Sequence, residues 1–365
     1  MNETYRVLFV DDDEQAVASA MEKLAEAGNY DPRRCDFGDF ERLARDFDPD
    51  LVVLDIMHGS PVDENATGIE IQQTIWNTHF RPVIFYTAFA DHTDGVQVHP
   101  FHVTVQKGSG SEDNVLQTAN RFLDSIKAVR AAEQALKREF PFVFRDTSLL
   151  ADLAFPDPGD FDARKNLLVR SARRRIAALM DDLSRHEEKL EAWEQYICPP
   201  IGKDLVLGDV LRSKDGHHHD PRSFRIVLTP SCDLVVTPTR SAKVESVLLA
   251  RCAAFMQGLA PANLHNTPKN KIVNRFPSSL LNSGYCDCIV ALPELPNHIP
   301  HMVADMKKLE LLTFDEIHDQ YVRVASIDSP FREMINWAYI QTAGRPGLPD
   351  RDCTKWAQSI HDSLP

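Results

Sequence analysis

Short apolar runs alternate with amphipathic segments over the first third of the chain. Three continuous runs, at 7–10, 51–54 and 82–87, are each bounded by polar residues. Runs of this kind are typical of parallel strands that are buried on both faces. Between them, apolar residues recur at helical spacing over 17–24, 40–47 and 71–75. The alternation predicts an α/β doubly wound, parallel, five-stranded sheet.

Polar residues stand where these predicted strands end. Asp11 and Asp12 follow the first run, Asp55 follows the second, Thr87 ends the third, and Lys107 follows a fifth strand predicted at 103–106. The carboxyl ends of parallel strands meet at one sheet edge, where ligands bind. Converging carboxylates repel one another unless a cation lies among them, and oxygen ligands of this kind suit Mg²⁺. One carboxylate then serves as a nucleophile toward a phosphoryl donor.

Taken in this order, these residues resemble the receiver domain of response regulators over about residues 4–126. The resemblance implies that Asp55 is the phosphoacceptor and that a histidine kinase is the donor. It also implies that Thr87 is a hydroxyl that moves toward the phosphoryl group and that Lys107 is its counter-ion. The implied Mg²⁺ ligands are the carboxylates of Asp11, Asp12 and Asp55 and the backbone carbonyl of Met57.

Three features depart from the family pattern. The loop from His58 to Thr67 is longer than is usual, so access to the acceptor is expected to differ. Gly108 stands where the family usually has proline, and Thr104 stands where a switching aromatic residue is common. The relay from Thr87 to the outer face is therefore expected to differ from the family's.

Helical periodicity extends beyond the receiver-like segment. One stripe covers 112–138, and Pro141 is expected to end that helix. A second stripe occupies heptad a and d positions from Val169 through His186 to Ile197, and two prolines follow it. This pattern predicts a coiled coil within a helical linker over 127–198. We expect either a homodimer through 165–197 or a hairpin with the 112–138 helix in the same chain.

Charge separates the two ends of the chain. Residues 1–125 hold 9 Lys and Arg against 23 Asp and Glu, whereas the rest of the chain holds 31 of each. A neutral output region provides little field to attract a polyanion, which makes DNA an unexpected partner. At 365 residues the chain is long enough for several domains, and we predict a receiver domain over 1–126, the helical linker over 127–198, and an output domain over 199–365.

The output domain has a strand-like pattern. Short apolar stretches lie at 205–207, 224–228, 246–250, 288–292, 301–304 with 309–312, and 321–324, and a helix is predicted at 331–343. This order predicts an α+β fold with a small β-barrel or a bent sheet, and it resembles SH3-like barrels. Fold alone does not determine function.

Several polar groups in the output domain are candidates for chemistry. Cys286, Cys288, His298 and His301 form a C-x-C…H-x-x-H set, which lies outside the usual zinc spacings, so metal binding is left open. The other groups are Ser231-Cys232-Asp233 at a strand end, the tract His217–His219, and a set of arginines and acids around the closing helix that includes Arg323 and Arg345. A buried turn cysteine, a solvated loop and structural salt bridges are the favoured interpretations of these three groups.

The sequence therefore predicts a response regulator with a non-DNA-binding output domain that binds or assembles with an unknown partner. The alternative is a regulated enzyme, foremost a nuclease-like SH3-type barrel, although there is no clear catalytic motif outside the phosphoacceptor site. The N-terminal sequence lacks a signal-peptide pattern, and no apolar run approaches the ~18–20 residues that span a bilayer. Seven scattered cysteines do not resemble a disulfide framework, so we expect a cytoplasmic location without membrane attachment.

Overall fold

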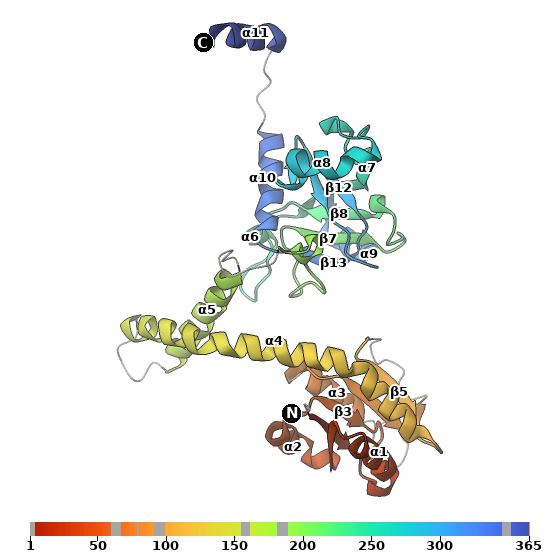
Figure 1. Ribbon diagram of the computed structural model, residues 1–365. Helices are drawn as coiled ribbons and strands as arrows, with labels where there is room; N and C mark the ends of the chain where they lie inside the picture. The colour runs from red at the N-terminus through yellow and green to blue at the C-terminus, as the bar shows by residue number, and fades with distance from the viewer. Residues whose placement is uncertain are drawn as a thin grey trace. The chain divides into compact units, whose positions relative to one another are not determined.

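The computed structural model describes residues 4–59, 67–78, 80–90, 99–154, 161–180, 189–344 and 352–364. The chain divides into two compact units, residues 1–185 and 186–365. Each unit has its own sheet and its own hydrophobic cores (Figure 1).

The first unit is built on a five-stranded parallel sheet with strand order β2-β1-β3-β4-β5. Its elements are β1 (Tyr5–Val10), α1 (Glu14–Glu26), β2 (Tyr30–Cys35), η1 (Phe37–Asp39), α2 (Phe40–Phe47), β3 (Leu51–Leu54), α3 (Thr67–Thr78), β4 (Val83–Thr87), β5 (His102–Gln106), α4 (Ser111–Ala154) and α5 (Phe161–Met180).

Helices cover both faces of this sheet. Phe9 points into a core shared with α1 and α4, whereas its neighbour Leu8 points into a second core shared with α2 and α3. Both side chains are fully buried. The predicted five-stranded, doubly wound parallel sheet is thus confirmed. Strand β2 had no apolar run to mark it, because this edge strand reads Tyr-Asp-Pro-Arg-Arg-Cys.

Helix α4 is longer than the sequence suggested. The expectation that Pro141 ends the helix is wrong. Helix α4 is 44 residues long and continues past Pro141 to Ala154. Proline fits the helical φ angle and removes one backbone hydrogen bond, a cost that packing can offset. Here Val143 and Thr147 are buried on the second half of α4, along which α5 packs.

The second predicted stripe is only partly helical. Helix α5 ends at Met180, and residues 181–188, with His186 among them, lie outside the described residues. The expected helix over its last part is wrong, because Trp193 lies in a 3-10 turn, η5 (Ala192–Gln195), and Ile197 lies in β6 (Tyr196–Ile197). Backbone pairing of β6 with β13 takes Ile197 into the second sheet, whereas Leu190 and Trp193 are exposed, so the apolar spacing of this segment does not mark a helix interface.

The second unit holds an eight-stranded antiparallel sheet with strand order β10-β11-β12-β9-β8-β7-β13-β6. Its further strands are β7 (Asp209–Ser213), β8 (Phe224–Val227), β9 (Ser246–Ala254), β10 (Tyr285–Cys286), β11 (Ile289–Leu292), β12 (Met302–Thr313) and β13 (Tyr321–Ile327). Its helices are η6 (Pro221–Ser223), α6 (Ser231–Leu234), α7 (Phe255–Gly258), η7 (Ala260–Ala262), η8 (Lys269–Lys271), α8 (Ile272–Phe276), η9 (Pro277–Leu281), α9 (Phe314–Gln320), α10 (Phe331–Ala343) and α11 (Cys353–Ser363).

The strands predicted at 224–228, 246–250, 288–292, 301–304 with 309–312, and 321–324 are confirmed as β8, β9, β11, β12 and β13, and the closing helix is confirmed as α10. Among the described residues β10 and β6 are edge strands, so the sheet is open, as in the bent-sheet alternative, rather than a closed barrel. The strand predicted at 205–207 is wrong, since β7 begins at Asp209. None of the helices in the described part of the chain is both long and apolar enough to cross a bilayer.

Candidate functional site

Three predicted site residues meet at the carboxyl edge of the parallel sheet. The Nζ atom of Lys107 lies 2.6 Å from Oδ2 of Asp11 and 2.6 Å from Oδ2 of Asp55. Adjacent strands carry the two acids, because β1 pairs with β3, and the lysine follows β5 on the other side of β4. Parallel topology alone therefore brings together residues that are up to 96 positions apart.

Burial leaves this cluster with an excess of poorly solvated negative charge. The Asp11 side chain is 2% exposed, that of Asp55 12% and that of Lys107 14%. Burial raises the pKa of Asp11 above its ordinary value, although the Lys107 ammonium partly offsets the effect. Burial alone would lower the pKa of Lys107, but the hydrogen bonds that its ammonium donates to Asp11 and Asp55 outweigh this effect and hold that pKa above its ordinary value. One ammonium thus neutralises only part of the carboxylate charge.

The backbone fixes the Asp55 carboxylate in place. Its Oδ1 atom accepts hydrogen bonds from the Ile56 amide at 2.7 Å and the Met57 amide at 3.4 Å. Helix α3 begins against this turn, where the Gly68 amide donates to the Ile56 carbonyl at 3.0 Å. A Cβ at Gly68 would lie 2.0 Å from the Asp55 carbonyl oxygen, so glycine permits this close approach. The sequence analysis missed Gly68, although a glycine close after the Asp55 loop, at the start of a predicted helix, was a usable signal.

The other predicted residues surround the cluster. Thr87 is fully buried at the end of β4, and its Oγ1 accepts a hydrogen bond from the Phe89 amide at 3.2 Å. Asp12 is exposed beside Asp11, and Met57 is buried. Of the long loop, residues 60–66 lie outside the described residues.

The donor atoms of this edge fit a hard cation. Asp11, Asp12 and Asp55 offer carboxylate oxygens and Met57 a backbone carbonyl. Across the described ranges, no group of three His, Cys, Asp or Glu side chains is arranged to hold a metal ion. Mg²⁺ nevertheless requires only one or two carboxylates, because water and phosphate oxygens complete its shell. The residues present therefore fit Mg²⁺ with a phosphoryl substrate better than they fit an all-protein cage.

A hydroxyl chain links the site to the start of α4. The buried hydroxyls of Tyr86 and Ser111 lie 2.7 Å apart, and Ser111 donates to the Gly108 carbonyl at 2.7 Å. Tyr86 directly precedes Thr87, and its ring centroid lies 5.7 Å from Nζ of Lys107. The sequence analysis missed this pair, since it looked for an aromatic residue at Thr104.

A second ionic cluster, here termed the clamp, lies at the opposite end of the same sheet. It consists of Arg6, Asp48, Asp50, Arg81, Arg130 and Glu133. The Arg81 guanidinium binds Glu133 of α4 through two hydrogen bonds, donates from Nε to the Pro49 carbonyl at 2.6 Å, and contacts Asp48 at 3.2 Å. The clamp thus ties α4 beyond residue 126 to the sheet.

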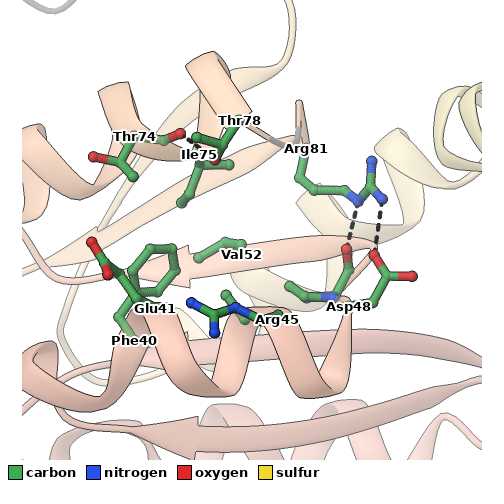
Figure 2. Close-up of a pocket in the computed structure, with 11 residues that line it drawn as sticks. Phe40, Glu41, Arg45, Asp48, Val52, Thr74, Ile75, Thr78 and Arg81 are labelled. Carbon is green, nitrogen blue, oxygen red and sulfur yellow. Dashed lines mark hydrogen bonds and ion pairs between the residues drawn. The ribbon is translucent and has the colours of Figure 1, made fainter. Parts of the chain in front are cut away.

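Figure 2 shows the cavity beside the clamp, with Arg81 reaching toward Asp48 at one end. The cavity holds about 240 Å³ between α2 and α3, and Phe40, Val52 and Ile75 form its apolar wall. The Arg81 guanidinium is already bound to protein oxygens, so it adds no free cation to the cavity for an anionic ligand.

The candidate groups of the second unit do not form a catalytic set in the described residues. The expected buried turn cysteine is wrong, since Cys232 is exposed; its Sγ lies 3.4 Å from the Asp233 carboxylate, which binds Lys243. Burial raises the pKa of the Cys288 thiol, which disfavours a thiolate, and His301 contacts Glu294 rather than the cysteines.

The remaining two groups have structural contacts. Within the tract His217–His219, the rings of His218 and His219 contact each other with centroids 3.8 Å apart and planes tilted by 46°. Arg323 pairs with the buried Asp209 at 3.0 Å, in line with the salt-bridge interpretation, and Arg345 lies outside the described residues.

Comparison with known proteins gives a fold-level likeness over about a third of the chain. No family model matches the sequence, and no curated protein matches it. A mutant form of the anti-anti-sigma factor PhyR from Bartonella quintana is 20% identical, with a TM-score of 0.27 over 34% of this chain and 52% of that chain. This chain therefore spans about half the length of that PhyR chain.

Two further solved structures are matched over nearly their whole length. The N-terminal domain of the nisin resistance regulator NsrR is 21% identical, with a TM-score of 0.27 over 34% of this chain and 98% of that chain. The signal receiver domain of a modulated diguanylate cyclase from Desulfovibrio desulfuricans G20 is 23% identical, with a TM-score of 0.25 over 34% and 98%. At these values a functional conclusion depends on the site itself.

Proposed function

We propose that the protein is a response regulator whose first unit accepts a phosphoryl group on Asp55 from a histidine kinase. The observation that carries this proposal is the Lys107 ammonium held 2.6 Å from both Asp11 and Asp55 at the carboxyl edge of a parallel sheet. A buried carboxylate whose oxygens are fixed by backbone amides and one ammonium is positioned for nucleophilic attack.

The chemistry assigned to these residues is an in-line phosphoryl transfer. An Asp55 oxygen attacks the phosphorus of a phosphohistidine, and the P–O bond forms as the P–N bond breaks. The departing ring nitrogen retains the electron pair. Lys107 then pairs with the oxygens of the transferred group. Thr87, whose backbone carbonyl accepts the Lys107 amide at 2.8 Å, is proposed to donate its hydroxyl to the same oxygens. Bound Mg²⁺, held by Asp11, Asp12, Asp55 and the Met57 carbonyl, would neutralise further phosphoryl charge.

The proposed route of the signal begins at the hydroxyl pair and follows α4. Movement of Thr87 toward the phosphoryl group displaces Tyr86, and Tyr86 holds Ser111 at the first residue of α4. Helix α4 continues without interruption to Ala154, so a change at its first turn is transmitted along a rigid element. The output of the second unit is proposed to be binding of, or assembly with, a partner other than DNA.

The decisive experiment is phosphorylation of the full chain with acetyl phosphate and Mg²⁺, followed by intact-mass measurement. We expect one hydroxylamine-labile phosphoryl group on the wild type and none on Asp55→Asn. Asp13→Asn is the matched control, because Asp13 is an exposed carboxylate that caps α1 close to the site. Equal labelling of Asp55→Asn and wild type would contradict the proposal.

A further inference from the structure

A cavity of about 280 Å³ lies in the second unit, lined by the loop that precedes β7 and by helix α9. Its floor is apolar, because Leu211 of β7, Leu234 of α6 and Ile317 of α9 form it. These three side chains are 1–5% exposed and belong to one hydrophobic core. The volume is at the small end of the range of ligand sites, about 300–1,000 Å³, so the cavity suits a small ligand.

Arg323 holds the loop wall of this cavity in place. Its guanidinium donates to the carbonyls of Ile201 at 2.6 Å and Gly202 at 3.2 Å. It also donates to the Asp204 carbonyl at 2.8 Å and pairs with the fully buried Asp209 at 3.0 Å. Helix α9 forms another wall, and a capping box fixes its first turn. Both walls are therefore ordered by contacts within the protein, which lowers the entropic cost of binding a ligand between them.

Two opposite charges belong to consecutive residues of the loop wall. Lys203 and Asp204 both line the cavity and are both exposed. In the described part of the chain, neither side chain has an ion pair or a hydrogen bond. The Arg323 guanidinium is already bound to protein oxygens, so it adds no free cation. The cavity thus offers one free ammonium and one free carboxylate beside an apolar floor.

We propose that this cavity binds a free α-amino acid with a compact apolar side chain, such as leucine. The Lys203 ammonium pairs with the carboxylate of the ligand, and the Asp204 carboxylate pairs with its ammonium. The apolar side chain of the ligand lies against Leu211, Leu234 and Ile317. A simple carboxylate would face Asp204 with a like charge, and a simple amine would face Lys203 in the same way. A ligand that carries both charges at one end of an apolar body matches both groups and the floor.

Titration calorimetry of the full chain with leucine and two analogues tests the match of charges. Isocaproate is leucine without the ammonium, and isoamylamine is leucine without the carboxylate. We expect saturable binding of leucine, and a dissociation constant about tenfold or more higher for each analogue. The absence of saturable leucine binding up to about 10 mM, where even a millimolar site would be filled, would overturn the proposal. Isocaproate or isoamylamine binding as tightly as leucine would overturn it too.

A series of straight-chain ligands tests the apolar floor without any change to the protein. Alanine, 2-aminobutyrate and norvaline differ by one methylene each and carry the same two charges. Burial of each added methylene should lower the dissociation constant about fourfold. Equal affinities along the series would overturn the assignment of the ligand side chain to the floor.

Two exposed substitutions assign the charges to residues. Lys203→Met should raise the dissociation constant of leucine about tenfold or more and should not weaken isoamylamine, which has no carboxylate. Asp204→Asn should weaken leucine similarly and should not weaken isocaproate, which has no ammonium. Lys269→Met, an exposed lysine of η8 outside the cavity, is the matched control and should bind leucine as wild type does. Wild-type leucine affinity in either Lys203→Met or Asp204→Asn would overturn the proposal. Asp55→Asn should bind leucine normally, which separates this result from that of the phosphorylation experiment.

Discussion

A Cβ atom placed on Gly68 would lie 2.0 Å from the backbone carbonyl oxygen of Asp55. The first turn of α3 is therefore packed directly against the loop that positions the acceptor. Any side chain at this position must displace either the helix or the loop, since the three nearest atoms, from Asp55 and Ile56, all belong to the backbone.

Gly68→Ala is accordingly expected to impair both phosphorylation and stability. We expect labelling by acetyl phosphate to slow by about 10- to 100-fold, because small misplacements of a nucleophile are costly. We expect a loss of about 1–3 kcal/mol in the free energy of unfolding, measured with urea. The control is Gly38→Ala, since a Cβ at Gly38 meets nothing within 4 Å. Wild-type labelling of Gly68→Ala would show that the acceptor loop tolerates displacement.

Lys107→Met separates the contribution of the Lys107 ammonium to stability from its contribution to phosphorylation. Without it, the buried Asp11 and Asp55 carboxylates face each other unneutralised, and we expect a loss of about 3–5 kcal/mol in stability. Labelling should fall by about 100-fold or more, because charge on the phosphoryl oxygens is no longer compensated. Adding Asp11→Asn to Lys107→Met should recover much of the stability and none of the labelling. Recovery of both would assign Lys107 a structural role only.

The sequence was sufficient to predict this site because parallel topology determines most of its geometry. Once the apolar runs before Asp11 and Asp55 are recognised as neighbouring parallel strands, their carboxyl ends must lie side by side at one sheet edge. Lys107 follows from the same rule, two strands further along the sheet. The roles of all the site residues, including Asp55 and Lys107, remain predictions, since position at the sheet edge does not by itself assign chemistry.

Tertiary contacts determined the features that the sequence did not predict. Strand β2 is polar because it lies at a sheet edge, so it carries no apolar signal. Pro141 does not end α4, because α5 packs along the continuation. Ile197 is compatible both with a helical heptad pattern and with a strand. Its pairing with Ser326 of β13 places it in a strand. Such long-range pairing cannot be predicted from a local sequence pattern.

Tyr86→Phe is expected to leave phosphorylation intact and to interrupt its transmission. The substitution removes a buried hydrogen bond to Ser111, worth about 1 kcal/mol, and leaves the ring beneath Lys107. In wild type, beryllofluoride, a mimic of the phosphoryl group, should change the rate of amide hydrogen exchange over the first turns of α4. In Tyr86→Phe this change should be lost. Tyr30→Phe is the control, because the Tyr30 hydroxyl also binds α4, at Asn120, but from β2. An unchanged exchange response in Tyr86→Phe would exclude this route.

The clamp predicts a pH dependence of stability. Burial alone would raise the pKa of Asp48, but the hydrogen bonds and charges of Arg6 and Arg81 outweigh it and hold that pKa below its ordinary value of 3.8. A carboxylate with a lowered folded-state pKa contributes stability that is complete above the unfolded-state pKa and is lost as pH falls through the folded-state pKa. The contribution of Asp48 should therefore be constant at neutral pH and should disappear below 3.8.

Asp48→Asn tests this directly. The Asp48 side chain is 46% exposed, so solvent screening limits the expected loss at neutral pH to about 0.5–1 kcal/mol. Urea unfolding of both proteins between about pH 6 and about pH 3 should show the difference in unfolding free energy shrinking toward zero at the acidic end. Asp46→Asn, an exposed carboxylate in the last turn of α2, two residues before Asp48 and outside the clamp, should differ little from wild type throughout. A difference for Asp48→Asn that persisted at the lowest pH would mean that the arginines hold the Asp48 side chain by packing rather than by charge.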